Sequence, residues 1–361
     1  MIQTAIPTSP FSLSMSRGRR VLGTLAISLT LVSARGPARA ADPKIDASLK
    51  SATRYLLSQQ KPKGMVGDQF SMAMTSLSVL ALAACGHQPA DASPEGQAMR
   101  KGIDFILLPE NQTKEGYFGR VDNSRMYGHG ITTLMLAEMA GMGVDDKQDA
   151  LIREKCKLGV RLILRAQAMR KDPTSSGGWL YEPDSQGADM SVTCWQVMAL
   201  RAAQNAGMEV PKEAIDNVVA YMKRMYQQVP GSTGPNAAGG FGYSSPSTGT
   251  STTAEGLLAM QVCGQYEAKE TIAAGNHLLK EDINKATHPF YSIYYYAQGM
   301  YQRGGKFAEA SRRIVPEILL PKQKPEGAFE GEDEGAGKVY TTSMSVLALA
   351  VKNHFLPIYQ R

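Results

Sequence analysis

The sequence predicts an all-α fold, an (α/α)6 toroid in which six helix hairpins form an inner ring of parallel helices within an outer ring. Three observations carry this prediction. The turn glycines Gly116, Gly178 and Gly240 recur 62 residues apart, and a long fixed period indicates a repeat architecture. Amphipathic segments alternate with segments that carry almost no charge. Glycines follow the charge-poor segments, as they do where helices end.

The two kinds of helix differ in how their apolar residues are distributed. In 212–227, Ile215, Val218 and Met222 fall on one helical stripe, which is typical of a helix with one face in solvent. Segments 69–86 and 340–351 contain no charged residue, and 251–264 contains only Glu255. A helix that is apolar on all sides must be surrounded by protein. The amphipathic helices are therefore expected outside and the charge-poor helices inside.

Pairing the helices in chain order gives six units. Their approximate bounds are 44–86, 94–141, 147–207, 211–264, 267–304 and 305–352. In the fifth unit His288-Pro289-Phe290 replaces the Gly-aromatic turn, which returns in the sixth as Gly327-Ala328-Phe329. Neither terminal unit has the polar face that caps an open solenoid, so the ring is expected to close. Strict alternation also makes the inner helices parallel, with all their N-termini on one face.

Residues 1–40 are predicted to be a signal peptide and 41–361 the toroid domain. The segment has five arginines and no acid, an apolar run at 21–34 too short to span a bilayer, and the cleavage pattern Ala38-Arg39-Ala40. An exported protein, periplasmic or extracellular, is expected, with twin-arginine export as one route because Arg19-Arg20 precedes the apolar run. The alternative is an uncleaved membrane anchor.

The remaining chain is nearly neutral. Without residues 1–40 it has 34 basic and 33 acidic residues, which gives no electrostatic reason to expect nucleic acid. No transmembrane helix is expected in the mature chain, and nothing in the sequence predicts an oligomeric state. Cys85, Cys156, Cys194 and Cys263 match neither a zinc pattern nor a disulfide framework.

The predicted arrangement favours a particular kind of ligand. Helix N-termini gathered at one mouth present free N–H groups and positive dipole ends, which suit an anionic group. The barrel below that mouth would be apolar and aromatic. An elongated hydrophobic molecule with an anionic head would match both parts.

The repeats resemble those of the squalene cyclase and protein prenyltransferase β-subunit superfamily. The segment Arg161-Leu-Ile-Leu-Arg-Ala-Gln167, followed by Gly177-Gly178-Trp179, resembles the Gln–Trp motif of the cyclases, and the likeness covers about residues 44–352. It implies the α/α toroid fold and an isoprenoid ligand. Gly128-His129-Gly130 resembles the segment that contacts diphosphate in the prenyltransferases.

The sequence departs from both activities of that superfamily. Ser191 stands where the prenyltransferase zinc site has cysteine, and later inner helices begin without the ligating histidine, so no metal and no cofactor are expected. Segment 251–255 resembles the Asp-Cys-Thr-Ala-Glu motif of the cyclases, but Ser251 replaces the catalytic acid, and a hydroxyl is too weak an acid for that role. The prediction is therefore a non-catalytic ligand-binding or scaffold protein.

Six residues are candidates for the site. Tyr127, His129, Trp195 and Ser251 are predicted to bind ligand, and His129 is expected to touch its polar end. Asp189 and Glu255 are the candidates for catalysis, although a helix N-cap is the simpler role for Asp189. Two alternatives keep an enzyme: an isoprenoid-processing enzyme with an altered site, or a glycan-active α/α barrel that uses Asp189 and Glu255 as paired carboxylates.

Overall fold

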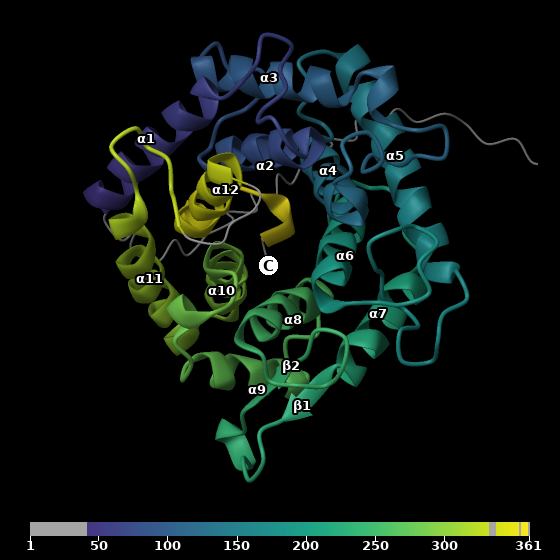
Figure 1. Cartoon of the computed structure of the whole chain (residues 1–361), viewed down its shortest axis with the longest axis vertical. Helices are drawn as coiled ribbons and strands as arrows, with labels where there is room; N and C mark the ends of the chain where they lie inside the picture. The colour runs from purple at the N-terminus through teal and green to yellow at the C-terminus, as the bar shows by residue number, and fades with distance from the viewer. Residues whose placement is uncertain (1–41, 332–336, 354, 360–361) are drawn as a thin grey trace, which may run out of the picture. The chain divides into compact units, whose positions relative to one another are not determined.

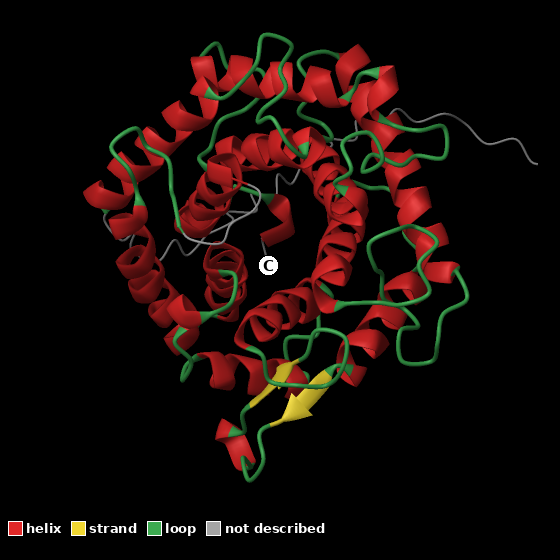
Figure 2. Cartoon of the chain, in the orientation of Figure 1, coloured by secondary structure: helices red, strands yellow, loops and turns green. Residues whose placement is uncertain are grey.

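The computed structural model describes residues 42–331, 337–353 and 355–359. The predicted signal segment 1–40 lies outside these residues. The described part contains twelve α-helices, which alternate between an outer and an inner ring, as Figures 1 and 2 show. The outer helices are α1 (Pro43–Ser58), α3 (Pro94–Ile106), α5 (Asp146–Ala168), α7 (Lys212–Arg224), α9 (Lys269–Leu278) and α11 (Gly305–Leu319). The inner helices are α2 (Ser71–Ala84), α4 (Arg125–Met139), α6 (Met190–Asn205), α8 (Thr250–Val262), α10 (Pro289–Arg303) and α12 (Gly337–Leu349).

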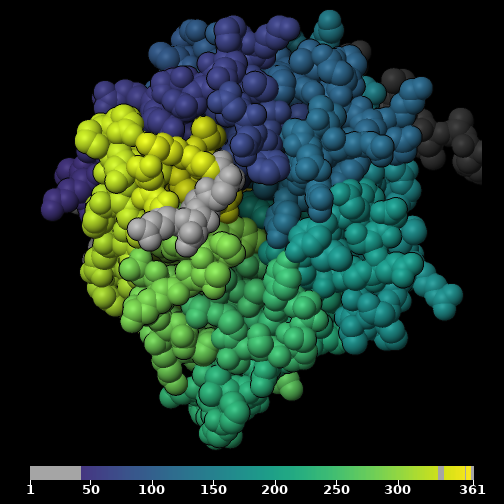
Figure 3. Space-filling model, viewed as in Figure 1, coloured from purple at the N-terminus to yellow at the C-terminus, as the bar shows by residue number. Residues whose placement is uncertain are grey.

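Both rings close, which confirms the predicted toroid. Each inner helix contacts the next around the ring, and α12 packs against α2. In Figure 3 the units follow one another in chain order, with the C-terminal unit beside the N-terminal one. Burial follows the predicted division: thirteen of the fourteen residues of α2 are buried, whereas α7 buries only one stripe. Strand is limited in the described residues to an antiparallel pair, β1 (Tyr226–Gln228) and β2 (Gly239–Phe241).

A repeated glutamine ties the outer ring together. The Gln167 side-chain amide donates to the carbonyls of Gly177 in its own turn and Ala214 in the next outer helix, both at 2.9 Å. The same pair of bonds is made by Gln60 with Gly64 and Ala98, by Gln112 with Gly116 and Lys155, and by Gln323 with Gly327 and Ser48. Because Ser48 belongs to α1, the last of these bonds joins the sixth unit to the first.

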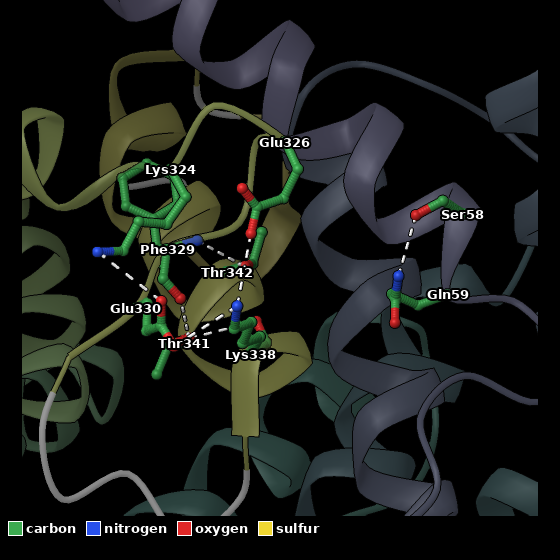
Figure 4. A network of polar contacts seen from close by, with 9 residues as sticks. All are labelled: Ser58, Gln59, Lys324, Glu326, Phe329, Glu330, Lys338, Thr341 and Thr342. Atoms are coloured by element: carbon green, nitrogen blue, oxygen red, sulfur yellow. Dashed lines mark hydrogen bonds and ion pairs between the residues drawn. The ribbon is translucent and has the colours of Figure 1, made fainter.

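The turns before the inner helices repeat a second bond. In the sixth unit the Phe329 backbone N–H donates to the Thr342 hydroxyl at 2.9 Å, and the Thr341 hydroxyl donates to the Phe329 carbonyl (Figure 4). Equivalent bonds to a side chain near the start of the inner helix join Val66 to Thr75, Phe118 to His129, Trp179 to Thr193 and Phe241 to Thr253. These bonds fix each turn against the helix that follows it.

The C-terminal segment covers one end of the inner ring. It contains the short 3-10 helices η5 (Ala350–Asn353) and η6 (Pro357–Tyr359). Asn353 donates to the carbonyl of Ala84, the last residue of α2, and the Ile358 N–H donates to the Glu138 carboxyl near the end of α4, both at 3.3 Å. The segment therefore lies at the C-terminal ends of inner helices and leaves their N-terminal ends to form the site.

Candidate functional site

A cavity of about 1000 Å³ lies at the N-terminal ends of the inner helices. All six of them contribute, through residues of their first two turns, and the loops before α4, α6, α8 and α10 add further residues. Four of the six predicted site residues line it: Tyr127, Trp195, Ser251 and Glu255. We call it the central cavity. The predicted gathering of helix N-termini on one face is what brings these residues, distant in sequence, together.

The cavity rim carries a connected chain of hydroxyl groups around one carboxylate. Tyr127 Oη lies 2.6 Å from Ser191 Oγ, and Ser191 donates to Asp189 Oδ1 at 3.1 Å. Tyr243 donates to Asp189 Oδ2 at 2.9 Å, and its hydroxyl also contacts that of Tyr181. Four of these five residues, all except Asp189, line the cavity. The rim is thus polar and held in place before any ligand arrives.

Asp189 is the N-cap of α6, as the simpler interpretation of the sequence held. It is fully buried, and its Oδ1 accepts the backbone N–H of Val192 at 2.7 Å. Burial raises the pKa of this carboxyl, and its hydrogen bonds act in the opposite direction. Both oxygens are already bonded to protein donors, so Asp189 has an evident structural role in closing the helix and organising the rim.

Glu255 has the opposite surroundings. It lines the cavity one helical turn below Ser251, about 6 Å deeper along α8, and its side chain is 2% exposed. Its Oε2 has no hydrogen-bond partner among the described residues. Burial first, and the charge of Asp189 second, raise its pKa well above the usual value. Both causes penalise the ionised form and so favour the neutral carboxyl in this residue of the cavity wall.

Trp195 and Ser251 are positioned by neighbouring inner helices. The Trp195 indole stacks on Tyr294 of α10, with ring centroids 5.8 Å apart and an interplanar angle of 8°. Ser251 accepts a hydrogen bond from Ser292 at 2.7 Å. Each of these side chains is therefore held by α10 while it lines the cavity, and the Trp195 side chain is almost completely buried there.

The structure places His129 elsewhere than the sequence led us to expect. Its ring is fully buried between Tyr117 and Phe118 and does not line the cavity. Nδ1 accepts the Phe118 N–H at 3.4 Å, which leaves Nε2 to donate to the Gly159 carbonyl at 3.1 Å. Burial lowers its pKa to about 4, so the ring is neutral at pH 7 and adds no positive charge to the mouth. His129 occupies the position that a threonine holds in four other units.

A count along α4 explains the difference. Tyr127 and Ile131 both line the cavity and lie four residues apart, on one helix face. His129 lies two residues from each and therefore on the far side of the helix. The same spacing of four gives the cavity pairs Ser191–Trp195 and Ser251–Glu255. The four-residue spacing of these side chains is the feature of the sequence that indicates which face of each inner helix lines the cavity.

Sequence reasoning missed three further residues at the mouth. Phe70, Asn123 and Arg125 have φ of 49°, 58° and 55°, in the left-handed region that side chains other than glycine seldom adopt. All three line the cavity, and they are the non-glycine residues with positive φ in the described part of the chain. Arg125 also pairs with Glu182 at 3.4 Å. Such strain gathers at functional sites; asparagine adopts this region more readily than most residues, whereas Phe70 and Arg125 are types that give no such signal.

Within 42–331, 337–353 and 355–359 there is no cluster of three or more histidine, cysteine, aspartate or glutamate side chains suited to a metal ion. The cysteines are free, and burial raises the pKa of the Cys156 thiol to about 12.

Among the described residues no helix combines the length and apolar composition of a membrane span.

Comparison with known proteins finds likeness in structure. The sequence matches no family model and no curated protein. The type II terpene cyclase MstE from Scytonema, as a variant in complex with its substrate geranylgeranyl dihydroxybenzoate, superposes with a TM-score of 0.51 at 14% identity, over 87% of this chain and 98% of that one. The apo form of MstE gives 0.51 at 15% identity, over 87% and 99%.

A weaker likeness reaches sugar-active proteins. A glycosyl hydrolase family 88 protein from Bacteroides vulgatus gives a TM-score of 0.41 at 11% identity, over 86% of this chain and 99% of that one. The MstE comparisons, at their low identity, concern the fold alone. The chain is an α/α toroid that resembles a type II terpene cyclase in structure.

Proposed function

We propose that the toroid binds an elongated, largely apolar small molecule of isoprenoid type and does not transform it. The central cavity carries this proposal. Six helices converge on it, aromatic side chains such as Trp195 and Tyr291 line it, and its volume of about 1000 Å³ is at the upper end of the range for small-molecule sites. The fold shared with MstE, which binds geranylgeranyl dihydroxybenzoate, supports the ligand class.

The rim suits a polar or anionic head group. Helix N-termini surround it with partial positive charge, and Arg125 lines it. Arg125 is already paired with the exposed carboxylate Glu182, so a ligand anion would replace one partner with another. The apolar body of the ligand would then lie along Ile131 and Trp195 deeper in the cavity.

The glycan-active alternative needs two carboxyl groups free to act on a substrate. Asp189 is not free, because Val192, Ser191 and Tyr243 already occupy its two oxygens. Among the described residues that line the cavity, Glu255 then remains as the one carboxyl. This arrangement argues against paired-carboxylate hydrolysis.

An isoprenoid-processing enzyme is the second candidate, and Glu255 is the observation that favours it. Its neutral carboxyl faces an aromatic cavity, which is where a proton would be delivered to an alkene. The same burial that keeps it neutral makes it a weak acid, and a weak acid protonates an alkene poorly. We therefore place binding ahead of turnover; a new product after incubation with geranylgeranyl diphosphate, absent with Glu255→Gln, would reverse that order.

Tryptophan fluorescence offers a direct test of binding. The chain has two tryptophans, Trp195 in the cavity wall and Trp179 in a buried turn. Titration with geranylgeranyl diphosphate should change the emission of the wild type and of Trp179→Phe. Trp195→Phe should lose the response and still retain the ligand in native mass spectrometry. Absence of any response, together with absence of a co-purifying apolar molecule, would refute the proposal.

A further inference from the structure

The floor of the central cavity is apolar except at one point. The residues one turn inside the mouth are Met74 from α2, Ile131 from α4, Trp195 from α6 and Glu255 from α8. Among the described residues that line the cavity, Glu255 is the one acidic residue. A ligand that fills the cavity with hydrocarbon alone would therefore press apolar groups against a carboxyl group.

The protein does not satisfy this carboxyl from within. Oε2 of Glu255 is buried without a hydrogen-bond partner, although the residue is only 2% exposed. A buried polar group without a partner has lost its hydrogen bonds to water and gained none in return, which is unfavourable. At the rim, by contrast, both oxygens of Asp189 are paired.

The groups around Glu255 supply no positive charge. Electrostatic neighbours are Asp189 and Cys194 on α6, Tyr127 on α4, and Tyr291 and Tyr295 on α10. Asp189 is the charge that acts on it, and that charge is negative. These surroundings favour the protonated carboxyl, which carries one O–H donor.

We infer that Glu255 is a ligand-recognition residue whose protonated carboxyl donates a hydrogen bond to an acceptor oxygen at the inserted end of an otherwise apolar ligand. The inference rests on the proposed binding function and deepens it. The ligand class becomes an isoprenoid-like molecule with a ketone, ester or ether oxygen in its buried part, in addition to any polar head at the rim.

A ketone is the sharpest probe, because it accepts a hydrogen bond but cannot donate one. Farnesylacetone would be compared with the hydrocarbon in which a methylene group replaces the carbonyl, each titrated against Trp195 fluorescence. The wild type should bind the ketone about tenfold or more tightly than the hydrocarbon. Glu255→Leu should abolish that preference, and the control Glu154→Leu, on an exposed position of α5, should keep it.

The pH dependence identifies the proton. Affinity for the ketone should be constant below the raised pKa of Glu255 and should fall above it towards the affinity for the hydrocarbon, because ionisation removes the donor. Glu255→Gln retains an N–H donor that does not titrate, so it should bind the ketone without this dependence. Affinity for the hydrocarbon should not fall in the same way.

The possible failures are distinct. Equal binding of the ketone and the hydrocarbon by the wild type and Glu255→Leu would overturn the inference and leave the binding function intact. Tighter binding of farnesylamine than of the ketone, increasing with pH, would also overturn it, because a carboxylate would then be binding a cation. Binding of none of these probes would count against the proposed function itself.

Discussion

The Gly-aromatic turns and the central cavity, which meet along the same inner helices, are built on opposite principles. In five units the turn uses the same backbone N–H bond to the next helix, and in four the same glutamine closes the outer ring. In the cavity the side chains one turn inside the mouth differ from helix to helix, one carboxyl has an unpaired oxygen, and three mouth residues hold a strained backbone. Repeated turn and glutamine bonds mark the scaffold, whereas side chains that occur once and a strained backbone mark the site.

The largest effect should come from the scaffold, at Gly177. This residue has φ of 88°, and a Cβ there would lie 2.2 Å from the Asn217 carbonyl oxygen of the next outer helix. Gly177→Ala adds backbone strain and a clash that backbone must absorb, so we expect a loss of about 3 kcal/mol or more in the free energy of unfolding. Chemical denaturation would measure it.

Gly207 provides the matched control. Its φ is 79°, but a Cβ there would meet nothing within 4 Å. Gly207→Ala should therefore cost only the conformational term, about 1–2 kcal/mol. Equal losses in the two variants would show that the close approach between outer helices is not what the turn glycine protects.

The second effect concerns His129, which belongs to the scaffold because its ring is bonded to the Phe118 turn and to Gly159 of α5. His129→Ala leaves the Phe118 N–H and the Gly159 carbonyl unpaired in a buried site, so we expect a loss of about 2–3 kcal/mol. Affinity for geranylgeranyl diphosphate should not change. His129→Thr, which supplies the hydroxyl found in the other units, should recover part of the stability.

The same residue predicts a pH effect. Its folded pKa is about 4, below the usual 6.5, so the unfolded chain takes up a proton first as the pH falls. The wild type should thus lose stability relative to His129→Thr between pH 6.5 and 4, by up to about 1.4 kcal/mol per pH unit. A loss of ligand affinity in His129→Ala without a loss of stability would show that His129 belongs to the binding site and not to the scaffold.

The scaffold could be predicted from the sequence because it repeats. The 62-residue spacing, the alternation of helix types and the glycine positions each report the same geometry several times, so one degenerate unit at His288-Pro289-Phe290 did not hide it. The cap at Asp189 was also predictable, because capping chemistry depends on neighbouring residues. The site could be predicted only where it followed from the scaffold, as for the gathering of helix N-termini at one mouth.

The other features of the site depended on the rotation of each helix about its axis and on residues that are distant in sequence. The face of α4 that meets the cavity is set by the turn that packs against its other side, so His129 could not be placed from the motif around it. The left-handed backbone of Phe70 and Arg125 arises from loop closure and leaves no mark on residue type. The surroundings of Glu255 come from α6 and α10, which are distant in sequence and pack against α8 in the inner ring.

The smallest effect, and a change of sign, should come from the cavity at Glu255. Replacing an unpaired buried carboxyl with an apolar group of similar size removes a desolvation cost and leaves no partner behind. Glu255→Leu should therefore gain about 1 kcal/mol in the free energy of unfolding at acidic pH, where the carboxyl is protonated in both the folded and the unfolded chain. The gain should grow with pH: the folded pKa lies above the unfolded value, so the wild type loses stability as the pH rises from the unfolded towards the folded pKa. Below that window the two proteins should differ least.

Glu154→Leu should stay within about 0.5 kcal/mol of the wild type at every pH. If the wild type were more stable than Glu255→Leu at every pH, the carboxyl would stabilise the fold. Glu255 would then not show the expected contrast between scaffold and cavity.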